Sequence, residues 1–248
     1  MGEIKLLSLV VPSFRQEETI VEDILKIKEV LEGLSYSFEI IVVIDGAPKK
    51  TYCKLLPYVR HSKKIKVFKY KKNKGKGYAV RYGMLRSRGD IVGFIDAGME
   101  INPSGIVRLI DFLKNYKADI VVASKLHPDS KVKYPIYRLL FSYIYRKMTH
   151  LLFGFQVRDT QVGFKIFRRE VVDTVFPKLV VNNFAFDIEV LAIAYSKGFR
   201  RIVEGPVELD FNRASSITSA NFWKIISHMI IDTILIFYRI KFTNYYLR

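Results

Sequence analysis

The sequence predicts an α/β fold: a mostly parallel β-sheet with helices on both faces. Through residues 6–123, short apolar runs alternate with stretches of helical spacing. The runs are apolar on both faces, which is typical of strands buried inside a parallel sheet. Because strand–helix alternation indicates βαβ units, a chain of 248 residues is expected to bury a full core around such a sheet.

The expected elements follow one another from the N-terminus. The first strand, residues 6–12, stops at Pro12 and Ser13. Residues 17–34 read as a helix because Ile20, Ile24 and Ile27 have helical spacing and acids occupy the first turn, where the helix dipole favours them. The same patterns predict strands at 38–44, 65–70, 91–95, 119–123 and 201–209, and helices at 51–59, 77–87, 104–116 and 184–196. Residues 159–169 are assigned neither.

Two stretches of the second half have an unusual make-up. Residues 134–153 and 220–240 have helical periodicity, and each carries a narrow polar stripe on an otherwise apolar surface. Such helices are either core helices with one wet edge or interfacial helices in a lipid headgroup region. Tyr, Trp, Lys and Arg around both apolar faces favour a membrane surface. We expect a main domain at 1–218 and a C-terminal amphipathic helix at 219–248.

Charge and cysteine content narrow the class of protein. The formal net charge of +17 points to an anionic partner, whether nucleic acid, nucleotide or anionic membrane. Cys53 is the single cysteine, which excludes an intrachain disulfide and a multi-cysteine metal site. No signal-peptide pattern is present, and no stretch offers the roughly 18 uninterrupted apolar residues of a spanning helix. We therefore expect a protein that is soluble or peripheral to a membrane. The single cysteine fits a reducing compartment, and the expected location is the cytoplasmic face of a membrane.

Carboxylates follow two of the expected strands. Asp45 and Gly46 close the second strand, while Asp96, with Glu100 four residues on, closes the fourth. In open α/β sheets ligands bind outside the carboxyl ends of the strands, so Asp-x-Gly-x-Glu at a strand end is a candidate cation or diphosphate site. The alternatives are a capping role for Asp96 and a turn role for Asp45.

A glycine- and lysine-rich loop at residues 73–77 follows the third strand and opens a helix. Glycines at a helix N-terminus allow the backbone to approach an anion. Val80 stands where a dinucleotide fingerprint needs its third glycine, and no Lys-Ser or Lys-Thr pair follows. Nicotinamide, flavin and P-loop sites are therefore disfavoured.

Residues 158–165 crowd charges, amides and a glycine between apolar neighbours. A solvated basic face is one interpretation, and an anion site between the sheet edge and the apolar helices is the sharper one. The cations that outnumber the local acids are Lys125, Arg138, Lys165, Arg168 and Arg213.

Several of these sequence motifs occur in the order that is typical of one enzyme family. Residues 11–18, 42–48, 73–83 and 95–97 together resemble the inverting family 2 glycosyltransferases of GT-A fold. The later pieces resemble the polyprenyl- and dolichyl-phosphate hexosyltransferases, and they are 124–125, 134–142, 158–165 and 184–189. Asp-Thr-Gln-x-Gly-Phe-Lys and Ala-Phe-Asp-x-Glu are closer to the dolichyl-phosphate β-glucosyltransferase branch than to the mannosyltransferase branch. The resemblance covers residues 6–218.

The resemblance implies a nucleotide-diphosphate sugar donor of UDP-glucose or GDP-mannose type, Mg²⁺ or Mn²⁺, and a polyprenyl or dolichyl monophosphate acceptor at a membrane surface. It implies donor-binding roles for Pro12, Phe14, Gln16, Asp45, Lys76 and Asp96. It implies acceptor-phosphate roles for Ser124, Lys125 and Arg138. It implies roles at the reacting centre for Asp96, Asp159, Lys165 and Arg213.

The chain also departs from the family pattern. Gly98 stands where a second acid usually follows the Asp-Ala pair, and Glu100 matches a side chain that the mannosyltransferase branch uses. Because Mg²⁺ commonly takes only one or two carboxylates plus substrate phosphates, Asp96 and Glu100 are expected to suffice as metal ligands, with altered metal preference. Ile44 replaces a common acid and Arg15 a common asparagine, which bears on donor identity.

Rival functions remain at this stage. They are a family 2 glycosyltransferase with a non-lipid acceptor, a catalytically inactive relative, prompted by Gly98, and a basic nucleic-acid-binding protein. No recognisable nucleic-acid motif appears, so nucleic acid is not an expected partner. For a lipid phosphate acceptor, a second pKa near 6 makes the nucleophile an oxyanion at neutral pH, and the enzyme needs cations more than a general base.

Overall fold

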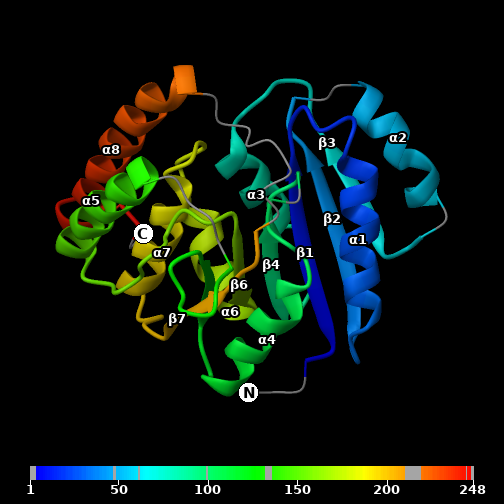
Figure 1. The fold of residues 1–248 in the computed structure, drawn as a ribbon, viewed down its shortest axis with the longest axis horizontal. Helices are drawn as coiled ribbons and strands as arrows, with labels where there is room; N and C mark the ends of the chain where they lie inside the picture. Colours follow the sequence, from blue (N-terminus) through cyan, green and yellow to red (C-terminus); the bar gives the residue numbers. More distant parts are fainter. Residues whose placement is uncertain are drawn as a thin grey trace.

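A computed structural model gives the fold of the protein (Figure 1). It describes residues 4–46, 49–60, 62–98, 100–131, 136–209, 219–243 and 245–246, with the side chains of 136–141 and 219–224 left aside.

Within these residues, seven strands form one sheet in the order β3-β2-β1-β4-β6-β5-β7. The strands are β1 Leu6–Ser13, β2 Ser37–Ile44, β3 Ile65–Lys69, β4 Ile91–Ile95, β5 Ile120–Ser124, β6 Phe164–Arg168 and β7 Ile202–Pro206. All pairs are parallel except those that β6 makes with β4 and β5. The expected α/β class with a mostly parallel sheet is confirmed.

The sequence interpretation is wrong at β6, which lies inside a stretch assigned no strand. The misleading residue is Lys165, whose charge argues against a central strand, although its side chain is fully buried. Burial is possible because Asp187 of a neighbouring helix forms an ion pair with the ammonium. That partner lies far away in sequence, so local patterning could not reveal the strand.

Two layers of helices cover the sheet (Figure 1). On one face, a core cluster joins the strands to α1 Ile20–Glu32, α2 Lys49–Arg60 and α4 Gly105–Asn115. On the other face, a second cluster joins them to α3 Lys76–Met84, α6 Arg169–Val175 with the short 3₁₀ turn Phe176–Lys178, and α7 Phe186–Ser196. Apolar side chains at helical spacing, such as Ile20, Ile24 and Ile27 of α1, form the buried faces.

The helices α5 Ile136–Phe153 and α8 Ser219–Lys241 form a further layer over α7 (Figure 1). Tyr145 of α5 shares a buried 2.8 Å hydrogen bond with Thr233 of α8. Met229 and Ile236 of α8 join the core cluster beneath. The expected boundary at 218/219 lies beside residues 210–218, which are outside the described part of the chain.

The outer surfaces of α5 and α8 are strongly apolar. The exposed large side chains there are Tyr143, Ile144 and Leu151 of α5 and Ile231, Ile234, Leu235 and Tyr238 of α8. Each helix therefore has a core face and an exposed apolar face. The core interpretation holds for the first face, and the membrane-surface interpretation of the second face stays a prediction. No helix in the described ranges is long and apolar enough to cross a membrane.

Candidate active site

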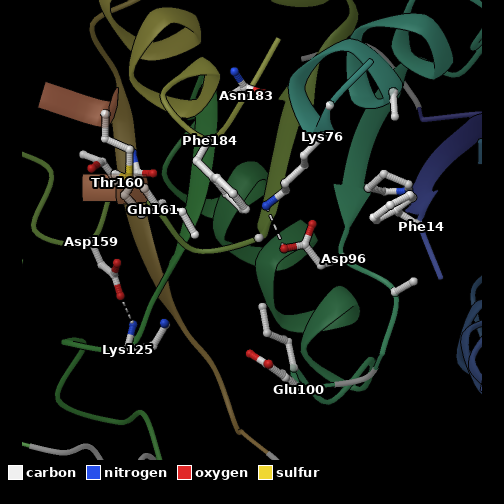
Figure 2. Close-up of a pocket in the computed structure, with 18 of the residues that line it drawn as sticks. Phe14, Lys76, Asp96, Glu100, Lys125, Asp159, Thr160, Gln161, Asn183 and Phe184 are labelled. Atoms are coloured by element: carbon white, nitrogen blue, oxygen red, sulfur yellow. Dashed lines mark hydrogen bonds and ion pairs between the residues drawn. The ribbon is translucent and has the colours of Figure 1, made fainter. Parts of the chain in front are cut away.

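One cavity of about 520 Å³ lies at the carboxyl ends of the parallel strands (Figure 2). Pro12 and Ser13 end β1, while Asp45, Asp96 and Lys125 directly follow β2, β4 and β5. Because β6 runs the other way, the residue that it brings to this edge precedes it: Gly163. The helices α5 and α8 close the far side with Ser142, Tyr145, Arg146, Ile225, Ile226 and Met229.

Asp45 holds the glycine- and lysine-rich loop in place. Its Oδ1 accepts a 2.7 Å hydrogen bond from the Lys74 amide, and its Oδ2 accepts from the Gly75 amide at 2.9 Å and the Asn73 side chain at 3.0 Å. Gly75 has φ +97°, and a β-carbon there would stand 2.5 Å from the carbonyl oxygen of Asn182. The predicted donor residue is thus a loop anchor; its contact with a donor stays a prediction.

Asp96 and Lys76 form the centre of the cavity (Figure 2). Lys76 Nζ lies 2.7 Å from Asp96 Oδ2, and the Asp96 amide donates to the Gly163 carbonyl at 2.8 Å. Burial lowers the pKa of Lys76, but the charges of Asp96, Asp187 and Glu100 outweigh it, and the net pKa is raised. The capping alternative for Asp96 gains no support, because its carboxylate bonds to a lysine.

The fit of this site to a divalent cation follows from its oxygen donors. Asp96 Oδ1 is buried with no hydrogen-bond partner in the described part of the chain, and Glu100 is an exposed carboxylate on the same cavity. The described residues contain no cluster of three or more His, Cys, Asp and Glu side chains. Two carboxylates match what Mg²⁺ or Mn²⁺ needs when substrate phosphates and waters complete the shell.

Gly98, which replaces a common acid, has a backbone reason to be glycine. Its φ is +99°, a conformation that side chains rarely adopt. Its amide donates a 2.8 Å hydrogen bond to Asp23 of α1, which fixes the loop after β4. Gln16 packs beside Gly98, and Phe14 is 44% exposed at the cavity rim with the Arg15 guanidinium 5.1 Å from its ring centre.

Lys165 supports the site from beneath. Its ammonium is fully buried, does not line the cavity, and bonds to the Val162 carbonyl at 2.8 Å and to Asp187 Oδ1. Burial lowers the pKa of Lys165 and raises that of Asp187, so the two values approach each other. The structure therefore gives Lys165 no direct access to a substrate.

A second polar group lies on the α5 side of the cavity. Asp159 Oδ2 accepts a 3.0 Å hydrogen bond from the Lys125 amide, and burial raises the pKa of Asp159. Glu204 of β7 accepts from the amides of Arg158 and Asp159, both at 3.0 Å. Lys125, Arg146 and Arg158 all line the cavity and bring cations to it.

The remaining predicted residues do not join this group. Ser124 is fully buried and does not line the cavity; its hydroxyl accepts from the Leu126 amide at 3.3 Å. The side chain of Arg138 and all of Arg213 lie outside the described residues.

Sequence reasoning assigned no site role to several residues that matter here. Arg146 was part of the polar stripe of residues 134–153, which was the available signal. Asp187 lies in residues 184–189, which resemble a family motif, but nothing in the sequence indicated that its partners are buried lysines. Gly163 belongs to the family motif in residues 158–165, but nothing in the sequence indicated its contact with Asp96. That contact arises only when β6 is placed beside β4.

Positive charge is concentrated in one stretch of the chain beside the cavity. Residues 46–89, which contain α2, β3, the glycine- and lysine-rich loop and α3, carry 15 lysines and arginines and no acidic residue. Their field attracts anionic ligands.

Comparison of the sequence with models of known protein families identifies one family. Residues 8–176 match the model of the family described as glycosyl transferase family 2. The chain belongs to glycosyl transferase family 2.

Similar curated proteins share one name. The "Dolichyl-phosphate beta-glucosyltransferase" of Dictyostelium discoideum is 30% identical over 201 residues, which cover 76% of this chain and 62% of that protein. The protein of the same name from Homo sapiens is 29% identical over 233 residues, covering 88% and 71%. The match to the Dictyostelium protein thus spans under two thirds of its length.

Solved structures share the fold. Glucosyl-3-phosphoglycerate synthase from Mycobacterium tuberculosis, crystallised with Mn²⁺, UDP and glucosyl-3-phosphoglycerate, superposes with TM-score 0.69 at 19% identity, over 93% of this chain and 79% of that one. Mannosyl-3-phosphoglycerate synthase from Rubrobacter xylanophilus gives TM-score 0.72 at 16% identity, over 95% and 74%. The sheet and its flanking helices are those of the GT-A glycosyltransferases.

Proposed function

We propose that the protein transfers glucose from UDP-glucose to a polyprenyl or dolichyl monophosphate with inversion at the anomeric carbon. One observation carries the proposal: a single cavity joins the strand-end pair Lys76–Asp96 to a cationic wall between the sheet and two apolar-faced helices. The names of the curated relatives support glucose and dolichyl phosphate as the transferred group and acceptor.

The donor is proposed to lie over the ends of β1, β2 and β4. Pro12, Phe14 and Gln16 line that end of the cavity, with the loop that Asp45 holds. The α3 N-terminus behind Gly75 faces the same space, where the positive end of the helix dipole and Lys76 favour a diphosphate. UDP in similar folds supports a uridine donor.

A divalent cation, Mg²⁺ or Mn²⁺, is proposed to be held by Asp96 and Glu100 and would neutralise charge on the departing diphosphate. This chain's own part is to hold the carboxylate in place through Gly163 and to keep Lys76 within reach of the diphosphate. The neighbour crystallised with Mn²⁺ supports a metal of this kind.

The acceptor phosphate is proposed to bind between Lys125 and Arg146. An oxyanion with a second pKa near 6 attacks without a general base, so the two cations serve to hold it in line with the anomeric carbon. Asp159 positions the backbone of Lys125 by accepting the hydrogen bond of its amide. Ile225, Ile226 and Met229 give the lipid chain an apolar wall.

The exposed apolar faces of α5 and α8 are proposed to rest in the headgroup region of a membrane, on its cytoplasmic side. Their aromatic rims suit an interfacial position. This arrangement brings the α5–α8 side of the cavity close to a membrane-held acceptor.

The test is a transfer assay with radiolabelled UDP-glucose and GDP-mannose against dolichyl phosphate, comparing wild type with Asp96→Asn. We expect glucosyl lipid from UDP-glucose, and loss of at least about 100-fold in the variant, because the interaction acts on charge developing in the transition state. Transfer only to water-soluble acceptors would favour a non-lipid acceptor. Full activity of Asp96→Asn would refute the role of Asp96.

A further inference from the structure

Four buried or half-buried charged side chains form a quartet at the cavity. Lys76 and Asp96 line the cavity, while Lys165 and Asp187 lie behind them. Lys165 bonds to Asp187 Oδ1, and Lys76 bonds to Asp96 Oδ2 at 2.7 Å. Lys76 Nζ also lies 4.0 Å from Asp187 Oδ2. That second oxygen is buried with no hydrogen-bond partner among the residues described. Within the described ranges, the quartet therefore holds two carboxylate oxygens without a hydrogen bond, Asp96 Oδ1 and Asp187 Oδ2, and the second lies 4.0 Å from an ammonium that is bonded elsewhere.

A cation that approaches Asp96 meets this ammonium. The Asp96 side chain is 40% exposed, but its Oδ1 is buried, so the accessible part of the carboxylate lies on the Oδ2 side, where Lys76 binds. Coordination through Oδ2 places a divalent cation beside the Lys76 ammonium, which repels it, and rotation of the carboxylate to present Oδ1 moves Oδ2 away from Lys76. An ammonium that is only 16% exposed then needs another anion, because an unpaired buried charge is strongly unfavourable.

The backbone around Lys76 and Asp187 is closely packed. A β-carbon on Gly75 would stand 2.5 Å from the Asn182 carbonyl oxygen, and one on Gly77 would stand 2.7 Å from Phe186 Cβ. The backbones of Lys76, which lies between these glycines, and Asp187, which follows Phe186, are therefore held close together. A small rotamer change closes the 4.0 Å gap between Lys76 and Asp187 without moving either helix.

We propose that Asp187 is a positioning residue that takes over the Lys76 ammonium when Asp96 binds a divalent cation. The exchange keeps Lys76 at the cavity floor, where it can face a diphosphate, and it lowers the free energy needed to release Asp96. This inference rests on the metal site of the proposed function. Lys165 has a separate part, since it keeps Asp187 compensated before the exchange.

The experiment measures Mn²⁺ affinity by electron paramagnetic resonance, without substrate. Asp187→Asn alone would leave Lys165 buried and unpaired, and Lys165→Met alone would leave the Asp187 carboxylate in the same state. The test variant is therefore Lys165→Met with Asp187→Asn, which removes the ion pair as a neutral unit, and the reference is the wild type. We expect the double change to weaken Mn²⁺ binding about 10–100-fold, the range typical of outer-shell partners of metal ligands.

The matched control makes the same double change in a Lys76→Met background. With no ammonium to relocate, we expect the double change to alter Mn²⁺ affinity by less than about threefold, because it removes no net charge near the site. An equal loss with and without Lys76 would mean that the double change acts without any relocation of Lys76 and would overturn the proposal.

A crystal structure of the wild-type protein with Mn²⁺ and UDP gives a test that depends on no variant. We expect Lys76 Nζ at hydrogen-bond distance, about 3 Å, from Asp187 Oδ2 and no longer on Asp96. Mn²⁺ on Asp96 with Lys76 still bonded to it would overturn this inference alone. Mn²⁺ absent from Asp96, with Lys76 still paired there, would overturn both this inference and the metal site.

Discussion

Gly163 lies directly against the carboxylate of Asp96: a β-carbon on Gly163 would stand 1.8 Å from Oδ2. The Gly163 carbonyl also accepts the Asp96 amide hydrogen at 2.8 Å. These contacts join the end of β4 to the start of the antiparallel strand β6. The position of the proposed metal ligand therefore depends on a residue with no reactive group.

Gly163→Ala is expected to displace the Asp96 carboxylate and lower kcat by about 100-fold, since a misplacement of an ångström at a catalytic group can cost that much. Overpacking should reduce the free energy of unfolding by about 1–3 kcal/mol, leaving a folded protein. Transfer assays and urea unfolding measure the two effects. Gly105→Ala is the control, because its added β-carbon meets nothing nearer than Phe164 Cε1 at 3.8 Å; normal activity in Gly163→Ala would contradict the prediction.

Arg146→Gln is expected to raise the KM for polyprenyl phosphate about 10–100-fold and to leave the KM for UDP-glucose unchanged, because hydrogen bonds to charged groups contribute about 1.5–3 kcal/mol. Steady-state kinetics with each substrate varied in turn gives the measurement. Lys147→Gln is the control, since Lys147 is exposed and does not line the cavity. A rise in the KM for UDP-glucose instead would mean that Arg146 contacts the donor and would contradict its role at the acceptor phosphate.

The double change Ile231→Ser with Ile234→Ser is expected to lower vesicle binding by at least about tenfold. The reason is that it removes two apolar side chains that would be buried in the membrane. The two isoleucines are 57% and 53% exposed, so folding should be unaffected. Co-sedimentation with anionic vesicles measures the change, and transfer to a short, water-soluble polyprenyl phosphate should persist. Leu25→Ser on α1, where Leu25 is 39% exposed, is the control; equal losses in both variants would argue against a specific membrane face.

Asp90→Asn is expected to remove a pH-dependent contribution to stability. The Asp90 carboxylate accepts from the Leu6 amide at 2.9 Å and the Lys5 amide at 2.8 Å, and these bonds lower its pKa. The contribution is therefore complete above the unfolded pKa of about 3.9 and is lost as the pH falls through the lower folded value.

Urea unfolding at pH 6 and pH 3 checks this sign. The wild type should be more stable than Asp90→Asn at pH 6, and the difference should shrink at pH 3. A difference that does not change with pH would show that the carboxylate charge is irrelevant to the contact.

Local sequence patterns were enough to predict most of the sheet. Ile91–Ile95 was predicted residue for residue, and β1 and β2 were predicted to within one residue at each end, because parallel core strands are continuously apolar. The β6 strand was missed because Lys165 interrupts that pattern. The helices α5 and α8 were found, but their division into a core face and an exposed apolar face was not, since both faces are apolar in sequence.

The sequence by itself determined the family, the order of the elements and the residues at the strand ends, among them Asp45 and Asp96. These follow from short-range periodicity and from the rule that parallel strands share a carboxyl edge. The tertiary structure decided which groups meet: Gly163 against Asp96, Lys76 between two carboxylates, and Arg146 of α5 in the same cavity as Lys125. Such contacts join residues far apart along the chain, where no periodic signal links one partner to the other.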